Sequence, residues 1–504
     1  MKFNRSSGIL LHPTSLPGPY GIGDIGSRAH RWIDFLSGAG CGLWQVLPIG
    51  PTGYGDSPYQ CFSSFAGNPL LISPDTLLRD DLLHPDDLYD HPCFPEDRVD
   101  FGEVIPWKAG VLDRSFIRFQ HTHSHQLNAE MEEFQAKHST WLEDFALFMA
   151  LKEAHGGAPW NTWEKPLRDR KPESLSEARK LNAVAIQRQI YRQFLFYRQW
   201  SKLRSHAHEK NLQIIGDIPI FVAHDSADVW ANPQLFHLDN TGMPTFVAGV
   251  PPDYFAPTGQ LWGNPLYRWD VHAADGYTWW LERIKASLAM VDIIRVDHFR
   301  GFAGYWEVPG NAKTAEIGRW VPGPGMDFFH SIRKSLGDLP IIAEDLGVIT
   351  PDVVQLRDSF DLPGMRIFQF AFDDTPEDPF LPHNYPVNCV VYTGTHDNDT
   401  VRGWYERVPE KDKAFYRRYL DRDGSTVSWD MIRGVWSSVA VFGLAPMQDF
   451  LSLGNEARMN YPGNPSGNWM WRMSNNAQTP ELQVNIKELN YLYSRMNTST
   501  ENTI

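Results

Sequence analysis

Residues 278–297 read TWWLERIKASLAMVDIIRVD, and this stretch decides the fold. Its first part, Thr278–Met290, repeats apolar side chains at the three- and four-residue spacing of one helix face. Its second part, Val291–Asp297, is a β-branched apolar run that ends at an acidic residue, as buried strands often do. A second helix–strand pair follows, with a helical pattern at Met326–Leu336 and a similar apolar run at Leu339–Asp345. Strands that alternate with helices in this way predict a parallel sheet.

Eight apolar runs of this kind are candidate strands, at Gly8–Leu11, Gly42–Ile49, Leu212–Val222, Val291–Asp297, Leu339–Asp345, Met365–Phe372, Cys389–Asp397 and Phe442–Phe450. Helical patterns separate most of them, as at Ile25–Ser37. Eight strand-helix units that close on themselves form a (β/α)8 barrel, so the predicted fold is the TIM barrel of the α/β class. A doubly wound open sheet is the alternative. The absence of a G-x-G-x-x-G pattern after any strand weighs against it.

Two connections are too long for a plain loop and helix, although residues 1–504 are expected to form a single catalytic barrel domain. The segment 50–211, after the second strand, is expected to be a largely helical insertion. The segment 223–290, after the third strand, is rich in Pro, Gly, Asn and Trp, and is expected to be a loop subdomain over the active-site cleft. Within the first insertion the helical patterns cover 104–120, 126–155 and 174–207. The polar tail after Ser494 is expected to fray.

Composition narrows the class of protein. The apolar fraction of 42% excludes a disordered chain, and the net charge of −15 argues against binding to nucleic acid. The four cysteines form no C-x-x-C pair, which fits a reducing compartment. The sequence has no signal-peptide pattern and no apolar run of the length that spans a membrane. A cytoplasmic location is therefore expected, and a plastid stroma is the less favoured alternative.

Acidic residues stand at the carboxyl ends of five candidate strands, where a (β/α)8 barrel places its active site. They are Asp217, Asp297, Glu344 with the adjacent Asp345, Asp397 and Asp449. Carboxylates that converge on one mouth repel each other, and they persist where a metal or proton chemistry uses them. Helix capping and strand-end ion pairs are the structural alternative for each acid taken alone.

Three of these acids suit the chemistry of glycosidic bonds. Arg295 and Asp297 share a strand face, and a guanidinium favours the ionised carboxylate that a nucleophile requires. Glu344 ends the next strand in an apolar setting beside another carboxylate, which should raise its pKa and suit a general acid. Asp397 is placed to bind ligand hydroxyls and to repel Asp297. A retaining enzyme needs its two carboxyl groups about 5–5.5 Å apart, which adjacent barrel strands permit.

A metal site is the main chemical alternative at this mouth. His396, Asp397 and Asp399 are able to ligate a cation, and metal-dependent hydrolases also use barrels. His121, His123 and His125 alternate in a polar stretch after a helix, where a solvated segment is the favoured interpretation. No EF-hand pattern is present. The sequence therefore predicts no metal and no other cofactor.

The motifs of this chain resemble those of glycoside hydrolase family 77, the 4-α-glucanotransferases called amylomaltase or disproportionating enzyme. Nine segments carry the resemblance, namely Ser6–Gly18, Asp56–Gln60, Gly216–Val222, Gly249–Phe255, Trp262–Pro265, Arg295–Phe299, Ala343–Gly347, Gly394–Thr400 and Asn460–Asn464. Their number and their order along the chain make the resemblance specific.

The resemblance implies roles for individual residues. Asp297 corresponds to the family's nucleophile, Glu344 to its acid/base and Asp397 to its stabiliser of the transition state. The residues that it implies in substrate binding are Ser57, Tyr59, Asp217, Asp253, Trp262, Arg295, His396 and Asn464. Among these, Trp262 matches an aromatic side chain on a loop over the cleft, whose closure favours a sugar acceptor over water.

The implied activity is transfer of an α-1,4-glucan segment to the 4-hydroxyl of another glucan or of glucose, by a retaining double displacement. Its partners would be α-1,4-glucans and maltooligosaccharides, with no nucleic acid and no membrane, and the chain is expected to be a monomer or a weak homo-oligomer. An α-amylase-type retaining glucan hydrolase is the alternative with the same carboxylates. A metal-dependent barrel hydrolase and a non-catalytic glucan-binding protein are further alternatives.

Overall fold

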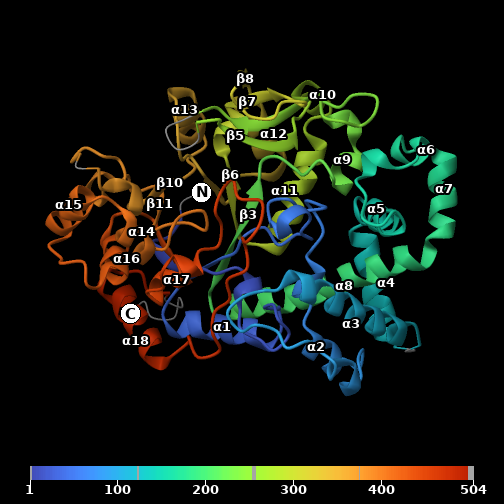
Figure 1. Ribbon diagram of the computed structural model, residues 1–504, viewed down its shortest axis with the longest axis horizontal. Helices are drawn as coiled ribbons and strands as arrows, with labels where there is room; N and C mark the ends of the chain where they lie inside the picture. Colours follow the sequence, from blue (N-terminus) through green and yellow to red (C-terminus); the bar gives the residue numbers. More distant parts are fainter. Residues whose placement is uncertain (1–2, 122–123, 253–256, 374, 498–504) are drawn as a thin grey trace.

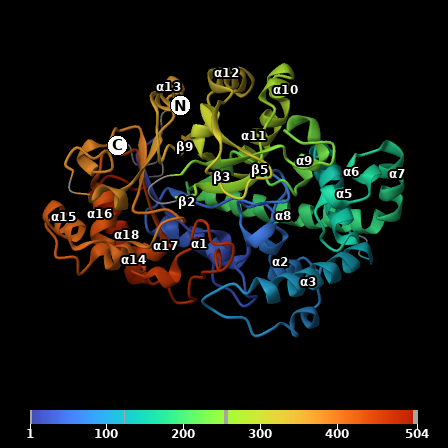
Figure 2. The same cartoon turned by 45° about the horizontal axis from the view of Figure 1, so that its top comes forward.

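The computed structural model describes residues 3–121, 124–252, 257–373 and 375–497. Eight parallel strands close into a barrel in the order β1-β12-β11-β10-β9-β6-β3-β2. Several of these strands are labelled near the centre of the molecule in Figures 1 and 2. These strands are β1 (Ser6–Leu10), β2 (Leu43–Gln45), β3 (Gln213–Pro219), β6 (Ile293–Asp297), β9 (Ile341–Ala343), β10 (Gly364–Ile367), β11 (Cys389–Tyr392) and β12 (Phe442–Pro446). The predicted (β/α)8 barrel is confirmed, and each strand overlaps one of the eight predicted runs. Six strands lie inside their predicted runs, whereas β1 begins two residues before its run and β10 one residue before.

The interior of the barrel is packed with apolar side chains that point inward from successive strands. They form one cluster, which includes Leu43, Ile215, Ile293, Met365 and Leu444. Gly8 on β1 gives this cluster room, because a Cβ atom there would lie 2.5 Å from the Cβ of Leu43. The barrel is therefore filled below its carboxyl end, and ligands have access only at the mouth.

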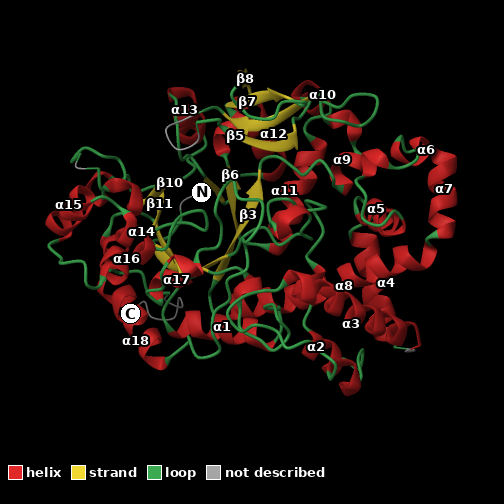
Figure 3. Cartoon of the chain, viewed as in Figure 1, coloured by secondary structure: helices red, strands yellow, loops and turns green. Residues whose placement is uncertain are grey.

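Helices cover the outside of the barrel after most strands, as Figure 3 shows. They are α1 (Ser27–Gly38) after β1, α8 (Ala183–Glu209) before β3, α11 (Thr278–Met290) before β6, α12 (Gly325–Leu336) before β9, α13 (Pro351–Ser359) before β10, α14 (Val401–Arg407), α15 (Glu410–Leu420) and α16 (Val427–Ser437) before β12, and α17 (Met447–Phe450) and α18 (Pro480–Leu492) after it. Between β10 and β11 the described residues form only 3-10 turns, at Phe368–Ala371 and Pro382–Asn384. The sixth unit thus departs from the ideal repeat.

The segment 50–211 contains a group of helices beside the barrel, drawn in blue to green at the lower and right side of Figure 1. Before α8 these helices are α2 (Pro74–Arg79), α3 (Phe101–His121), α4 (His125–Lys137), α5 (Leu142–Ala154), α6 (Lys165–Arg168) and α7 (Pro172–Leu181). Two expected helices are each divided in two, since α4 and α5 occupy 126–155 and a break at Asn182 separates α7 from α8. Short polar breaks of this kind leave the apolar spacing on either side unchanged, so the spacing alone does not reveal them.

The segment 223–290 contains more regular structure than a loop subdomain. After α9 (Ala227–Ala231) it forms β4 (Phe246–Val250) and β5 (Gln260–Pro265), and α10 (Trp269–Ala274) follows before α11. These strands join β7 (Gly304–Pro309) and β8 (Arg319–Pro322), which come from the next connection, in an antiparallel sheet of order β5-β4-β7-β8 at the top of Figure 1. The expectation of a loop is wrong here, because Gly and Pro residues interrupt the strands and hide their alternation.

Two arginines join the ends of the chain beneath the barrel. Arg495 is fully buried and donates hydrogen bonds to the carbonyls of Trp436, Ser6 and Ala440 at 2.8, 2.7 and 3.0 Å. Arg5 donates to the carbonyls of Tyr493 and Trp436, at 3.1 Å each. The prediction that the chain frays from Arg495 onward is therefore wrong for residues 495–497, and residues 498–504 lie outside the described part.

Candidate active site

The three candidate catalytic carboxylates lie at the same end of the barrel. Asp297 is the last residue of β6, Glu344 follows β9 directly, and Asp397 follows β11. Strands β6 and β9 are neighbours in a register that pairs Val296 with Ala343, so Asp297 and Glu344 leave adjacent strands at the same level. Asp297 and Asp397 line a cavity of about 1190 Å³ at the barrel mouth. Asp297 and Asp397 thus share one cavity, and the strand register places Glu344 beside Asp297.

Arg295 connects two of the strand-end acids. Its guanidinium lies 2.6 Å from Asp217 Oδ2 and 2.9 Å from Asp297 Oδ1, and the side chain is only 4% exposed. Burial raises the pKa of Asp217 to about 6, against the opposing effect of Arg295. Carboxylates on both sides raise the pKa of Arg295 itself above its ordinary value. The cation is thus permanent and offsets the charge of the carboxylate nearest to the cavity.

Glu344 is held by backbone amides. The N–H of His298 donates to Oε2 at 2.6 Å, and the N–H of Leu346 donates to Oε1 at 2.8 Å. Burial raises the pKa of Glu344 to about 7, and the nearby charge of Asp297 adds to this, while Arg295 and the two amides act in the opposite sense. Such a carboxyl group is able both to give and to accept a proton near neutral pH.

Asp397 is oriented by three neighbours. Its Oδ1 accepts a hydrogen bond from the side-chain amide of Asn460 at 2.6 Å, and its Oδ2 lies 3.4 Å from Nε2 of His396. Arg458 donates to the backbone carbonyl of Asp397 at 2.5 Å and pairs with Asp399. Sequence reasoning did not single out Asn460 or Arg458, although Asn460 belongs to one of the quoted motifs. The sequence around Asn460 gives no sign that its side chain binds Asp397, 63 positions away.

Four of the expected substrate-binding residues line the cavity, namely Ser57, Tyr59, Trp262 and Asn464. Tyr59 reaches the Arg295 cluster, because its hydroxyl donates to Asp217 Oδ2 at 2.9 Å. Its ring stacks on that of His396, with ring centroids 5.2 Å apart. Aromatic rings beside hydroxyl-binding acids suit the two faces of a sugar. Asp253, also expected in this set, lies outside the described residues.

The family was identified by comparison with known proteins. A family profile described as 4-alpha-glucanotransferase, glycoside hydrolase family 77, matches residues 11–478. The chain belongs to the 4-α-glucanotransferases. The relative from Thermus thermophilus named 4-alpha-glucanotransferase is 52% identical over 497 residues, which cover 97% of this chain and 99% of that protein. The relative from Solanum tuberosum, named 4-alpha-glucanotransferase, chloroplastic/amyloplastic, is 45% identical over 96% of this chain and 85% of its own length.

Solved structures agree with this family. The amylomaltase from Streptococcus agalactiae in complex with acarbose is 39% identical, with a TM-score of 0.95 over 98% of this chain and all of that one. The amylomaltase from Corynebacterium glutamicum, at 19% identity and a TM-score of 0.74, covers 98% of this chain and 74% of that one and shows a shared fold. The chain is thus an enzyme of the transferase class, and the resemblance stated from the motifs is confirmed.

Two strand-end acids of this glucanotransferase serve its structure. Asp449 is buried and accepts hydrogen bonds from the backbone N–H of Val401, at the start of α14, and from the hydroxyl of Thr393, at 2.8 and 2.6 Å. Asp345 pairs with Arg357 and accepts the backbone N–H of Met365 at 2.7 Å. Asp449 thus caps a helix and Asp345 forms a strand-end ion pair, which are the structural alternatives considered for single acids.

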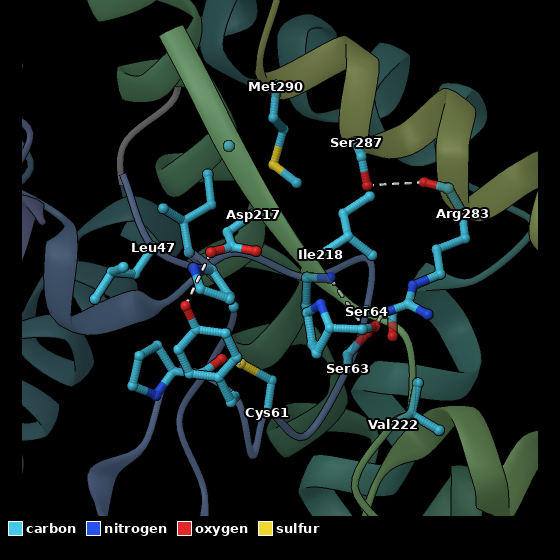
Figure 4. A pocket seen from close by; sticks show the side chains of 18 of the residues that line it. Leu47, Cys61, Ser63, Ser64, Asp217, Ile218, Val222, Arg283, Ser287 and Met290 are labelled. Atoms are coloured by element: carbon cyan, nitrogen blue, oxygen red, sulfur yellow. Dashed lines mark hydrogen bonds between the residues drawn. The ribbon is translucent and has the colours of Figure 1, made fainter. Parts of the chain in front are cut away.

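A second, small cavity lies behind Asp217 in the glucanotransferase (Figure 4). Its volume is about 70 Å³, and its wall includes Cys61, Ile218, Ser287 and Met290. The Oδ1 atom of Asp217 is buried and has no hydrogen-bond partner in the described part of the chain, while Oδ2 accepts two hydrogen bonds. Asp217 thus has one buried oxygen that no described residue binds.

Metal-binding groups are sparse in the described ranges. Within them, no three His, Cys, Asp or Glu side chains form a group that could hold a metal ion. His121 ends α3 and His125 begins α4, both exposed, and His123 lies outside the described residues. All four cysteines are free thiols. None of the helices formed by the described residues has the length and apolarity to cross a bilayer.

Proposed function

We propose that this glucanotransferase exchanges α-1,4 bonds by a double displacement in which Asp297 is the nucleophile and Glu344 the acid/base. An oxygen of Asp297 forms a bond to the anomeric carbon, the bond from that carbon to the leaving 4-oxygen breaks, and Glu344 gives its proton to that oxygen. The observation that carries the proposal is the pair of carboxyl groups at the ends of adjacent strands, with a guanidinium on Asp297 and a raised pKa on Glu344.

The second half of the reaction reverses the first with a new acceptor. Glu344, now ionised, takes the proton of an acceptor 4-hydroxyl, whose oxygen bonds to the anomeric carbon and releases Asp297. Two inversions give net retention, so an α-1,4 bond is formed again. The energy of the first bond is carried by the covalent intermediate, and no cofactor is required.

The remaining site residues are proposed to hold the sugar that is cleaved and its neighbours. Asp397, Asp217 and His396 supply oxygen and nitrogen atoms around the nucleophile, and Arg295 pairs with Asp217 and Asp297. Ser57, Trp262 and Asn464 lie farther along the cavity wall, and Asp253 is assigned from the sequence alone. The acarbose named with the Streptococcus agalactiae structure supports α-glucans and maltooligosaccharides as ligands of this cavity.

Transfer to a sugar requires that water be kept from the intermediate. Trp262 on β5 lines the cavity and packs edge-on against the ring of His298, with ring centroids 4.8 Å apart. A bulky ring beside the nucleophile occupies space that water would fill and leaves the acceptor hydroxyl as the positioned nucleophile. This contact supports a transferase over the α-amylase-type hydrolase, in agreement with the names of the relatives.

Incubation of the purified protein with maltotriose alone tests this function. The expected products are glucose and a ladder of longer maltooligosaccharides, with a constant number of reducing ends, because each transfer breaks one bond and forms one. The products are separated by size and the reducing ends are counted. Shorter sugars alone, with reducing ends that increase, would identify a hydrolase. An unchanged substrate would favour a glucan-binding protein, and loss of turnover after chelation would favour a metal-dependent enzyme.

The proton held by Glu344 predicts the alkaline limb of the pH profile. Glu344 must be protonated to act as the acid, and the protonated fraction falls as pH rises through its pKa of about 7. The value of kcat/KM for maltotriose is therefore expected to decline above about pH 7, by about tenfold per pH unit. Initial rates across pH 4–9 measure it. A decline that already begins near the ordinary glutamate pKa of about 4.3 would contradict the assignment.

The organisation of the chain is part of the proposal. Residues 1–504 are proposed to act as one catalytic unit, in which 50–211 is a largely helical insertion and 223–290 lies over the cleft. Residues 258–264 on the cavity wall support the second assignment. A monomer or weak homo-oligomer in the cytoplasm is proposed, and the four free thiols are consistent with a reducing compartment.

A further inference from the structure

His298 follows the nucleophile in a conformation that few side chains adopt. Its φ of 53° and ψ of 50° lie in the left-handed helical region. Of the residues other than glycine, Asn, Asp and His enter this region most readily, and residues branched at Cβ enter it least. The chain leaves strand β6 abruptly at this residue, immediately after the carboxylate that faces the cavity.

The turn directs two consecutive amides at Glu344. The N–H of His298 donates to the side-chain Oε2 at 2.6 Å, and the N–H of Phe299 donates to the backbone carbonyl of Glu344 at 3.0 Å. The backbone N–H of Glu344 in turn donates to the carbonyl of Val296 at 3.1 Å. The acid/base is thus attached at three atoms to the segment that carries the nucleophile.

The imidazole ring adds no charge to this arrangement. Burial lowers the pKa of His298 to about 4, so the ring is neutral at physiological pH. It is half-buried in the cavity wall and packs edge-on against Trp262. The ring and the backbone of His298 therefore have separable contacts, with Trp262 and with Glu344 respectively.

We propose that His298 is a positioning residue whose left-handed backbone aims its amide at Glu344 and fixes the acid/base carboxyl relative to Asp297. The property required at position 298 is the ability to adopt this backbone conformation, more than the imidazole. The inference rests on the proposed role of Glu344 as the acid/base.

Two matched pairs of variants separate the backbone from the ring. His298→Gly and His298→Ala both lack a ring and differ in their tolerance of the left-handed region, as do His298→Asn and His298→Leu, which have similar size. The expected kcat for maltotriose is about tenfold lower for Ala than for Gly and for Leu than for Asn, because a residue that avoids the region turns the amide away from Oε2. The change in KM from loss of the ring is expected to be the same within each pair.

The pH profile is a readout that general loss of structure does not move. The amide of His298 stabilises the ionised form of Glu344, so its loss raises the pKa of that group. The alkaline limb of kcat/KM is therefore expected to move to higher pH in the Ala and Leu variants and to stay in place in the Gly and Asn variants. Thermal unfolding midpoints of all four variants identify any that fail to fold.

Equal kcat and an unmoved alkaline limb within both pairs would overturn the positioning role. So would a fall in thermal midpoint with no change in kcat, because the strained backbone would then contribute only to stability. Neither result touches the assignment of Asp297 and Glu344, which their own substitutions test. Inactive Gly and Asn variants that fold normally would also overturn the proposal, since the ring would then be the essential group.

Discussion

Glu344→Gln is expected to lower the turnover of maltotriose by about 10³-fold, because glutamine cannot give a proton to the leaving sugar. The loss should be small in the first step when the donor is α-maltosyl fluoride, since fluoride leaves without protonation. The second step would still lack its base. The variant should therefore release a burst of fluoride equal to the enzyme concentration and accumulate a covalent maltosyl-enzyme, which mass spectrometry of the intact protein detects.

Asp297→Asn is the matched control for this experiment. It removes the nucleophile and keeps the size of the side chain, so neither donor should react, and no fluoride burst and no increase in protein mass are expected. A burst in Asp297→Asn, or transfer from maltotriose retained by Glu344→Gln, would contradict the assigned roles. In Asp297→Asn the amide oxygen can still accept from Arg295, whereas in Glu344→Gln the side-chain NH2 faces one of the two backbone amides that bind Glu344. Thermal unfolding of both variants therefore accompanies the assay, to confirm that they are folded.

Arg495→Met is expected to lower the free energy of unfolding by about 3 kcal/mol. Methionine keeps most of the buried volume but donates no hydrogen bond, so the carbonyls that Arg495 binds lose a charged donor in a buried site. Burial lowers the pKa of Arg495 to about 9, which reflects the cost of placing this cation in the interior. Urea denaturation followed by tryptophan fluorescence measures the change.

Arg433→Met is the control for Arg495→Met. Arg433 is exposed on α16 and donates to the hydroxyl of Tyr493 at 3.0 Å, close to the same end of the chain. Its replacement is expected to change stability by less than about 0.5 kcal/mol. If the two variants unfold at the same urea concentration, the carbonyl cluster around Arg495 contributes nothing measurable.

The strands and the acids of the mouth were predictable because they follow local rules. A β-branched apolar run ends where the strand reaches the barrel mouth. The sequence therefore predicts that Asp297, the last residue of such a run, lies at the mouth. The side-chain period of two placed Arg295 beside Asp297, and the structure has them 2.9 Å apart. The roles of these residues remain proposals, whereas the barrel and the family are established.

Other features depend on contacts between distant segments, which no local pattern encodes. Asn460 reaches Asp397 across 63 positions, and the amide of His298 reaches Glu344 across 46. Asp449 ends a predicted strand run, but the strand stops at Pro446 and Asp449 lies in α17, where it binds the start of α14 and Thr393. Arg495 stands in a polar tail whose composition indicates fraying, and only the fold provides the carbonyls that bury it. The sequence therefore shows that these polar and charged residues are present, but it does not show which distant residues they bind.

The antiparallel sheet β5-β4-β7-β8 has a consequence for redesign of the cleft. Strands β5 and β4 belong to the connection between β3 and β6. Strands β7 and β8 belong to the connection between β6 and β9, and β6 ends in the proposed nucleophile. Strand β4 of the first connection pairs with strand β7 of the second, from Phe246 opposite Pro309 to Gly249 opposite Trp306. If only one of these connections were replaced by that of a relative, the strands of the other would be left with an unpaired edge beside the cleft. The two connections therefore form the smallest unit that can be exchanged between relatives.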